Sequence, residues 1–209
     1  MTNKHIIINL GRQLGSGGHD IGRMLALDFQ ARYYDREILS RAAKESGLSE
    51  RMFEQHDEHK SFLRSFLHLP NGMANTGYQD TAGFSQDAFF KFQSDAILRA
   101  ADEGNCVFVG RCADYVLRNR LDTVNIFVTA NIDFRISQVM AKQGLKDRQE
   151  ARRFIEQGES HRAAYYKYYT GKKWGHSESY DLCIDSSVLG LHQTEKFIAE
   201  FIRRRFGLA

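Results

Sequence analysis

The glycine-rich segment near the amino terminus reads Asn9-Leu10-Gly11-Arg12-Gln13-Leu14-Gly15-Ser16-Gly17-Gly18-His19-Asp20-Ile21-Gly22. It follows a short apolar run and precedes the helical spacing of Ile21, Leu25 and Phe29, so we expect a strand, a tight turn and a helix. Such a turn aims backbone N–H groups and a helix start at one point, which favours phosphate. Glycine permits the close approach because it has no side chain. The segment predicts a phosphate-binding loop, with a tight turn that binds no ligand as the alternative.

Short apolar runs alternate with longer helical patterns along the rest of the chain, which is typical of a parallel sheet with helices on both faces. We assign strands to His5–Leu10, Arg32–Tyr34, Cys106–Val109, Val124–Thr129 and Leu182–Asp185. Further helices are predicted before Gly104, around Phe197, Ile198, Phe201 and Ile202, and from Asp147 to Tyr169. The last of these begins with the capping-box spacing of Asp147 and Glu150. The fold class expected is α/β, with one doubly wound, five-stranded parallel sheet.

Composition limits the classes of protein that this chain can belong to. Its 209 residues, 42% hydrophobic and 26% charged, fit one globular domain over residues 1–209. A net charge of +3 is too small to favour a nucleic acid polymer or a membrane surface as the main partner. The cysteines Cys106, Cys112 and Cys183 form no C-x-x-C pair, and no histidine motif predicts a metal site built from protein ligands. With no signal peptide or membrane span recognised, we expect a cytoplasmic protein.

Further motifs follow the glycine-rich segment in a defined order. They are Tyr33-Tyr34-Asp35-Arg36-Glu37-Ile38-Leu39, Val109-Gly110-Arg111-Cys112-Ala113-Asp114, Tyr165-Tyr166-Lys167-Tyr168-Tyr169-Thr170-Gly171-Lys172-Lys173-Trp174-Gly175 and Tyr180-Asp181-Leu182-Cys183-Ile184-Asp185-Ser186-Ser187. Each motif is weak alone, but their order over nearly the whole chain resembles the cytidylate-kinase-like family, relatives of the P-loop nucleoside monophosphate kinases.

This resemblance implies a three-layer fold, a monophosphate-binding lobe or mobile insertion at about residues 36–85, and a lid at about residues 147–175. It also implies a nucleotide kinase that moves the terminal phosphoryl group of ATP, with Mg²⁺, to a small phosphorylated acceptor. CMP or another pyrimidine monophosphate is the acceptor expected. The phosphate or nucleotide contacts would come from Arg12, Gly15, Ser16, Gly17, Gly18, His19 and Asp20.

Arginines outside the loop are the remaining candidates, because a guanidinium is permanently charged and grips phosphate oxygens in pairs. Arg111 follows a predicted strand, and ligands of open α/β sheets bind beyond the carboxyl ends of the strands. By similarity, Arg111 and Arg41 would hold the acceptor phosphate with Asp35 at the rim, while Arg162 and the weaker candidate Arg135 would be catalytic. The alternative for each arginine is an ordinary surface ion pair.

The loop departs from the pattern G-x-x-x-x-G-K-[ST], because Gly18 and Asp20 stand where the related kinases carry lysine and threonine. We expect an arginine to supply the missing positive charge, with Arg162 as the leading candidate and Arg12 or His19 as local alternatives. Two other functions remain open. One is a weak or inactive nucleotide-binding regulatory protein of the same fold, and the other is a kinase for a different small metabolite. The sequence predicts no oligomeric state.

Overall fold

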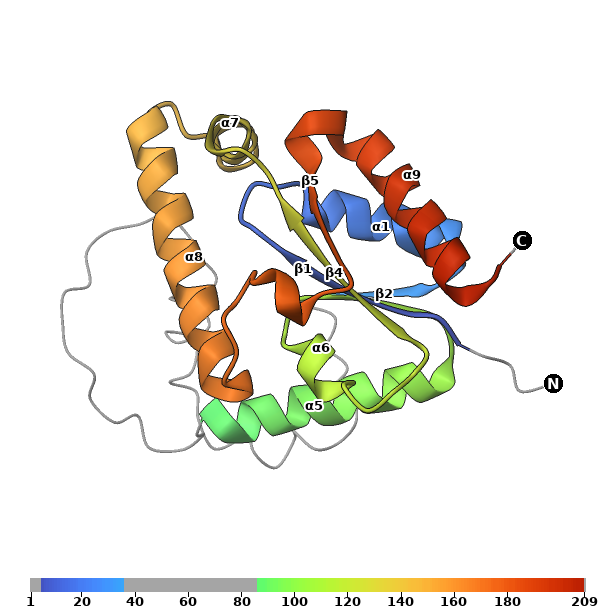
Figure 1. The fold of residues 1–209 in the computed structure, drawn as a ribbon. Helices are drawn as coiled ribbons and strands as arrows, with labels where there is room; N and C mark the ends of the chain where they lie inside the picture. Colours follow the sequence, from blue (N-terminus) through green and yellow to red (C-terminus); the bar gives the residue numbers. More distant parts are fainter. Residues whose placement is uncertain (1–4, 36–85, 209) are drawn as a thin grey trace.

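A five-stranded parallel sheet organises the computed structural model, which describes residues 5–35 and 86–208 (Figure 1). Its strand order is β2-β3-β1-β4-β5. The strands are β1 (Ile7–Arg12), β2 (Arg32–Tyr34), β3 (Cys106–Val109), β4 (Thr123–Thr129) and β5 (Leu182–Asp185). The predicted fold class is confirmed, and β2, β3 and β5 have the predicted bounds.

The first strand lies two residues further along the chain than the sequence predicted. Pairing with β4 continues past Leu10, because Gly11 lies opposite Phe127 and Arg12 lies opposite Val128. The long partner strand extends the ladder through residues that were expected to be loop. Arg12 therefore belongs to the end of the strand, where its backbone is fixed in the sheet.

One face of the sheet is covered by α1 (Gly18–Asp28) and α9 (Ser186–Phe206), as Figure 1 shows. Ile21 and Leu25 of α1 and Ile198 and Ile202 of α9 are fully buried against the strands. The last helix packs on the sheet through this stripe, whereas Phe197 of the same helix is 53% exposed. The buried stripe of α9 passes through positions 198 and 202, four residues apart on one helix face, and leaves position 197 on the solvent side.

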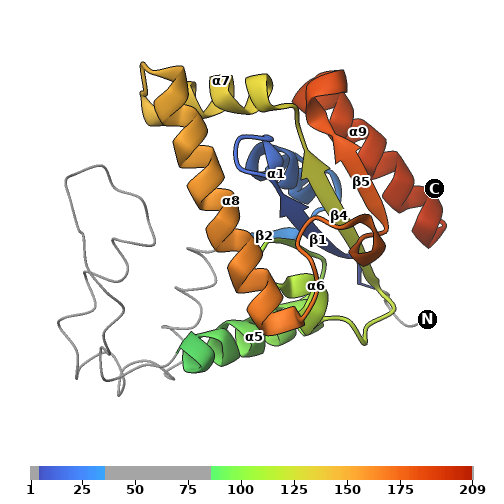
Figure 2. The same ribbon diagram turned by 60° about the vertical axis from the view of Figure 1, so that its left-hand side comes forward.

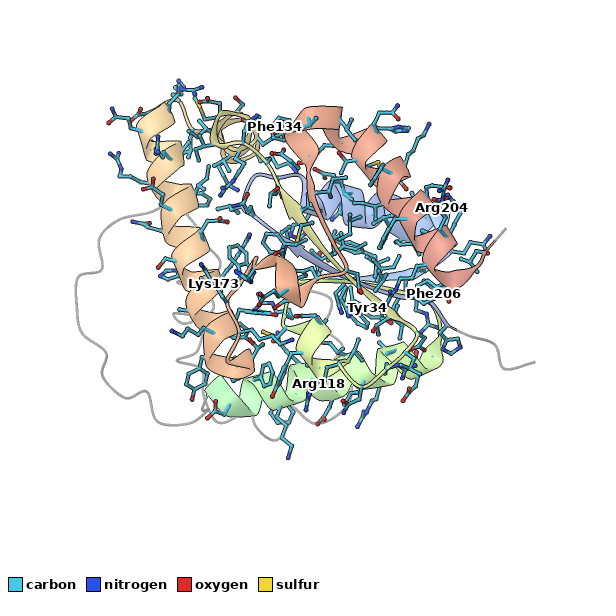
Figure 3. All side chains as sticks on the ribbon, viewed as in Figure 1. Tyr34, Arg118, Phe134, Lys173, Arg204 and Phe206 are labelled. Atoms are coloured by element: carbon cyan, nitrogen blue, oxygen red, sulfur yellow. The ribbon has the colours of Figure 1, made fainter. Side chains whose placement is uncertain are left out.

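The other face is covered by α5 (Gln86–Glu103) and the short α6 (Ala113–Val116). Ile97 and Ala101 of α5 pack with Phe108 of β3 and with Leu117, all with almost no exposed surface. Side chains fill the layers between the sheet and its helices in Figure 3. No helix within residues 5–35 and 86–208 is long and apolar enough to cross a membrane.

Two further helices stand beside the ends of the strands. The helices α7 (Ile132–Gln143) and α8 (Arg148–Thr170) pack on each other through Ile136, Val139, Ala151 and Ile155. Asp147 caps α8 by accepting a hydrogen bond from the backbone N–H of Gln149. Figure 2 shows α8 running from α7 down to α5, across the side of the sheet where the strands end. After α8, a short 3-10 turn η3 (Ser177–Ser179) leads into β5. The lobe expected at 36–85 lies outside the described residues.

Candidate functional site

The glycine-rich turn joins the end of β1 to the first residue of α1, as the sequence predicts. Gly15 and Gly17 both have left-handed backbone angles, with φ of 83° and 75°. A Cβ atom at Gly15 would lie 2.6 Å from the carbonyl oxygen of Arg135, so the turn packs directly on the backbone of α7. Since α1 begins at Gly18, its free N–H groups lie at the turn, where an anion is favoured.

Buried polar contacts fix this turn in place. The N–H of Leu14 donates to Oε1 of Glu159 over 2.7 Å, and Nε of Arg135 donates to the carbonyl oxygen of Leu14 over 2.8 Å. Nη2 of Arg135 also pairs with Oε2 of Glu159 at 3.0 Å. These bonds tie the turn to α7 and α8. Ser16 is fully buried, and its Oγ donates to the carbonyl oxygen of Gln13.

A cavity of about 450 Å³ opens beside the turn, at the carboxyl ends of β1 and β3. Its size is that of a site for a small ligand. Residues from the strand ends, from α1 and from α8 line it together. They are Asn9, Leu10, Gly11, Arg12, Leu14, His19, Arg23, Asp35, Gly110, Arg111, Cys112, Asp114, Phe154, Gly158, His161, Arg162, Tyr165, Tyr166, Trp174 and Tyr180.

Arg12, Arg111 and Arg162 all line this cavity. Nη1 of Arg162 donates to the carbonyl oxygen of Arg12 over 3.2 Å, and the guanidinium of Arg111 lies 5.9 Å from the ring centre of Tyr165. Burial lowers the pKa of each of the three guanidiniums, and for Arg12 the charges of Arg162 and Arg111 lower it further, to about 9. A ligand with negative charge would relieve this repulsion. The cavity is therefore suited to an anion such as phosphate.

The backbone that carries Arg111 is strained. Gly110, Arg111 and Cys112 follow one another with φ of 79°, 64° and 55°, and only the first of them is a glycine. Side chains rarely adopt these angles, and residues held in them concentrate at functional sites. The turn directs β3 into α6 and places Arg111 on the cavity wall. Burial raises the pKa of the Cys112 thiol to about 12, so this cysteine is a wall residue rather than a nucleophile.

A hydrogen-bonded chain runs from Arg12 through His19 to Tyr33. Nη2 of Arg12 lies 3.1 Å from Nε2 of His19, and Nδ1 of His19 lies 2.9 Å from the hydroxyl of Tyr33. A guanidinium only donates, so Nε2 accepts and the proton of the neutral imidazole sits on Nδ1. Burial, and then the charge of Arg12, lower the pKa of His19 to about 4. His19 is therefore neutral at physiological pH and orients Arg12.

Asp35 and Asp114 both lie on the cavity wall. The hydroxyl of Tyr166 donates to Oδ2 of Asp114 over 2.6 Å, while burial raises the pKa of Asp114. Asp114, Tyr166 and Tyr180 also line the cavity but were not predicted as site residues. Asp114 follows Arg111 by three residues in the same strand-end motif, and this spacing was the available signal.

The structure brings together Arg12, His19, Asp35, Arg111 and Arg162 around one cavity. The predicted residues Gly15, Ser16, Gly17 and Gly18 form the turn beside the cavity but do not line it, and Asp20 and Arg135 lie further away. Asp20 pairs with Nζ of Lys142 at 2.6 Å on a half-exposed surface, and Arg135 is buried behind the turn. Neither is among the lining residues. Arg41 lies outside the described residues.

The described ranges contain no group of three or more His, Cys, Asp and Glu side chains arranged to hold a metal ion. Magnesium in phosphoryl transfer needs no such cluster, because it takes one or two carboxylates with phosphate oxygens and water. The cavity offers Asp35 and Asp114 as carboxylates. Asp114 also accepts a hydrogen bond from Tyr166, and both carboxylates fit a phosphate-bound Mg²⁺.

Comparison with known proteins gives a family and a fold. The model of the family described as "Cytidylate kinase-like family" matches residues 7–188. An uncharacterized protein from Eubacterium ventriosum ATCC 27560 is 27% identical, with a TM-score of 0.73 over 96% of this chain and 99% of the other. Shikimate kinase from Bacteroides thetaiotaomicron is 13% identical, with a TM-score of 0.54 over 95% and 98%. A gluconokinase from Sinorhizobium meliloti 1021 is 10% identical, with a TM-score of 0.56 over 96% and 93%. Among curated proteins, none matches significantly.

Proposed function

Because this chain belongs to the cytidylate kinase-like family, we propose that it transfers the terminal phosphoryl group of ATP to a nucleoside monophosphate, with CMP or another pyrimidine nucleotide as acceptor. The observation that carries this proposal is the convergence of Arg12, Arg111 and Arg162 on one cavity beside the amino-terminal end of α1. Phosphoryl transfer requires mainly positioning and charge neutralisation, and these are what such a cavity offers.

In the proposed reaction, an oxygen of the acceptor phosphate forms a bond to the γ-phosphorus of ATP. The bond from that phosphorus to the bridging oxygen breaks, and ADP and a nucleoside diphosphate leave. The turn at Gly15–Gly18 and the start of α1 bind the phosphates of ATP. Arg111 holds the acceptor phosphate, and Arg162 donates to the oxygens of the group in transfer. Asp35 and Asp114 on the cavity wall would hold a Mg²⁺ ion, which would supply neutralisation of the charge between the phosphates.

A second candidate is a kinase that phosphorylates a hydroxyl group of another small metabolite. The two carboxylates on the cavity wall favour it, because a hydroxyl acceptor must lose a proton and a carboxylate positioned beside it can accept that proton. A phosphate acceptor needs no such base.

The test is to incubate the purified protein with Mg·ATP and either CMP, UMP, dCMP, AMP or a panel of hydroxy acids and sugars, and to follow ADP. Turnover with a pyrimidine monophosphate supports the proposal. Turnover only with a hydroxyl compound supports the second candidate. Binding of Mg·AMP-PNP without turnover of any acceptor contradicts both and leaves a nucleotide-binding regulatory protein.

A further inference from the structure

The side chain of Arg12 fills the space where a lysine at position 18 would begin. The common P-loop pattern has a lysine directly after the last glycine of the loop, and Gly18 stands there in this chain. A Cβ atom at Gly18 would lie 2.5 Å from Cβ and 2.8 Å from Cγ of Arg12. Both atoms belong to the stem of Arg12 near its fixed backbone, so they cannot move aside as a flexible tip would. The two side chains exclude each other.

A second glycine accommodates the charged end of Arg12. A Cβ atom at Gly110 would lie 2.1 Å from Nη1 of Arg12. The guanidinium therefore rests on the backbone at the end of β3, next to Arg111, while Nη2 contacts His19. From β1, the side chain of Arg12 passes over the first residue of α1 and enters the cavity.

This guanidinium lacks the partner that a structural arginine would have. Nε of Arg12 is buried and has no hydrogen-bond partner among the described residues. Within the same ranges, Arg12 forms no ion pair with a carboxylate, whereas Arg135 pairs with Glu159. Nη2 contacts the neutral His19, and the charges of Arg162 and Arg111 act on the guanidinium more strongly than that of Asp35. An incompletely paired buried cation is costly, and a bound anion would compensate it.

We propose that Arg12 is the phosphate-loop cation of this protein, delivered from the end of β1 in place of a lysine from α1, and that Gly18 and Gly110 provide the space for it. The inference rests on the proposed function, because it assumes that the cavity binds the phosphates of a nucleotide. Arg12 is better placed for this role than Arg162. Its backbone is paired in the sheet beside the loop, whereas Arg162 approaches from α8 and bonds to the carbonyl oxygen of Arg12.

An exchange of the two positions tests this inference. The variants are Arg12→Gly, Gly18→Lys and the double variant that carries both. Glycine is chosen at position 12 because a Cβ atom at position 18 would lie only 2.5 Å from the Cβ of Arg12. Affinity for Mg·AMP-PNP is measured by calorimetry and folding by thermal unfolding. We expect Arg12→Gly to weaken binding by at least about tenfold, the scale of a lost charge-assisted hydrogen bond. Gly18→Lys should also weaken binding and lower the melting temperature, and the double variant should bind better than either.

Arg12→Met and Arg12→Lys test the same role with less risk of unfolding than Arg12→Gly. Arg12→Met keeps an apolar stem and should bind Mg·AMP-PNP as poorly as Arg12→Gly. Arg12→Lys should bind it with intermediate affinity, since an ammonium keeps the charge but lacks the paired N–H donors of a guanidinium. Arg118→Ala is the matched control, because Arg118 is an exposed arginine that packs on Tyr115 outside the cavity. Its affinity should equal that of the wild type.

The outcomes separate this inference from the proposed function. If the wild type binds Mg·AMP-PNP and Arg12→Met binds it equally well, the role of Arg12 is refuted while the proposed function stands. A double variant that binds no better than Arg12→Gly, or a Gly18→Lys variant with wild-type affinity and stability, also refutes it. If the wild type does not bind Mg·AMP-PNP at all, the proposed function and this inference both fail.

Discussion

Nη1 of Arg162 donates a hydrogen bond to the backbone carbonyl oxygen of Arg12 across 3.2 Å, and so joins α8 to the end of β1. This bond uses one edge of the guanidinium, and the side chain still lines the cavity. The bond holds the side chain of Arg162 next to the backbone of the strand residue that we propose as the phosphate-loop cation. Arg162 can act on the phosphoryl group in transfer while the loop holds the rest of ATP.

We expect Arg162→Ala to lower kcat by at least about a hundredfold while it changes the affinity for ATP much less, because the contact strengthens as charge develops on the transferred oxygens. Arg162→Lys should rescue only part of the rate. Steady-state kinetics with the best acceptor, together with calorimetry on Mg·AMP-PNP, separate the two effects. Wild-type turnover in Arg162→Ala would remove this role.

The ion pair of Arg135 and Glu159 predicts an effect on folding stability rather than on turnover. The two side chains are only 8% and 18% exposed, and both also bond to the backbone of Leu14. Removing one partner leaves a buried charge, which typically costs ~3–5 kcal/mol. We expect Arg135→Met to lower the free energy of unfolding by about 3 kcal/mol, measured by urea denaturation. Arg152→Ala, which breaks an exposed pair with Glu156, should change it by less than about 0.5 kcal/mol.

A second variant distinguishes this anchor from a catalytic role. Arg135→Met combined with Glu159→Gln removes both charges and should recover part of the lost stability, since neither side chain is then an unpaired ion. If Arg135→Met leaves stability unchanged but abolishes turnover, Arg135 acts on the substrate, as the sequence analysis first suggested.

Most of the sheet was predicted from the local sequence, because the bounds of a strand follow from an apolar run between polar turns. The bounds of β2, β3 and β5 are as predicted, and so is the cap of α8 at Asp147. The end of β1 was missed because it depends on Val128 of β4, more than a hundred residues away in the chain. Pairing across the sheet leaves no signal in the glycine-rich segment itself.

Arg111, two residues after β3, lines the cavity as its position after a strand predicts, and Asp35 lines it as the family resemblance implies. Contacts between distant segments were not predictable. Asp20 turns toward Lys142 of α7, and Arg135 turns inward to Glu159 of α8. Gly17→Val, a substitution aimed at the glycine-rich turn, would not isolate the phosphate contact. A Cβ atom at Gly17 would lie 2.2 Å from a methyl group of Leu191, so the variant would disturb packing as well as any phosphate contact.

The region from Arg162 to Gly175 is expected to become more protected when both nucleotides bind. It contains the carboxyl-terminal half of α8 and lines the cavity through Tyr165, Tyr166 and Trp174. Closure over bound substrates excludes water in enzymes of this general design. Hydrogen exchange with and without saturating Mg·AMP-PNP and CMP measures the effect. Ile198, Ala199 and Ile202 of α9, buried against the sheet, serve as the internal control. Equal exchange in both states would leave α8 as a plain structural helix.

The neutral state of His19 predicts how stability depends on pH. Its pKa is lowered in the folded protein from 6.5 to about 4, first by burial and then by the charge of Arg12. Between these two values the unfolded chain binds a proton that the folded protein refuses, so the free energy of unfolding falls as pH is lowered from about 6.5 toward about 4. Above pH 6.5 the stabilising contribution of neutral His19 is fully present.

A glutamine side chain cannot be protonated in this range, and its amide oxygen can still accept a hydrogen bond from Arg12. His19→Gln should therefore make the pH dependence of the free energy of unfolding shallower. Denaturation at pH 7.5, 6.0 and 5.0 measures it, with the exposed His192→Gln as the control that keeps the wild-type slope. A slope in His19→Gln equal to that of the wild type would mean that His19 does not resist protonation, and the tautomer assigned from its bond to Arg12 would have to be given up.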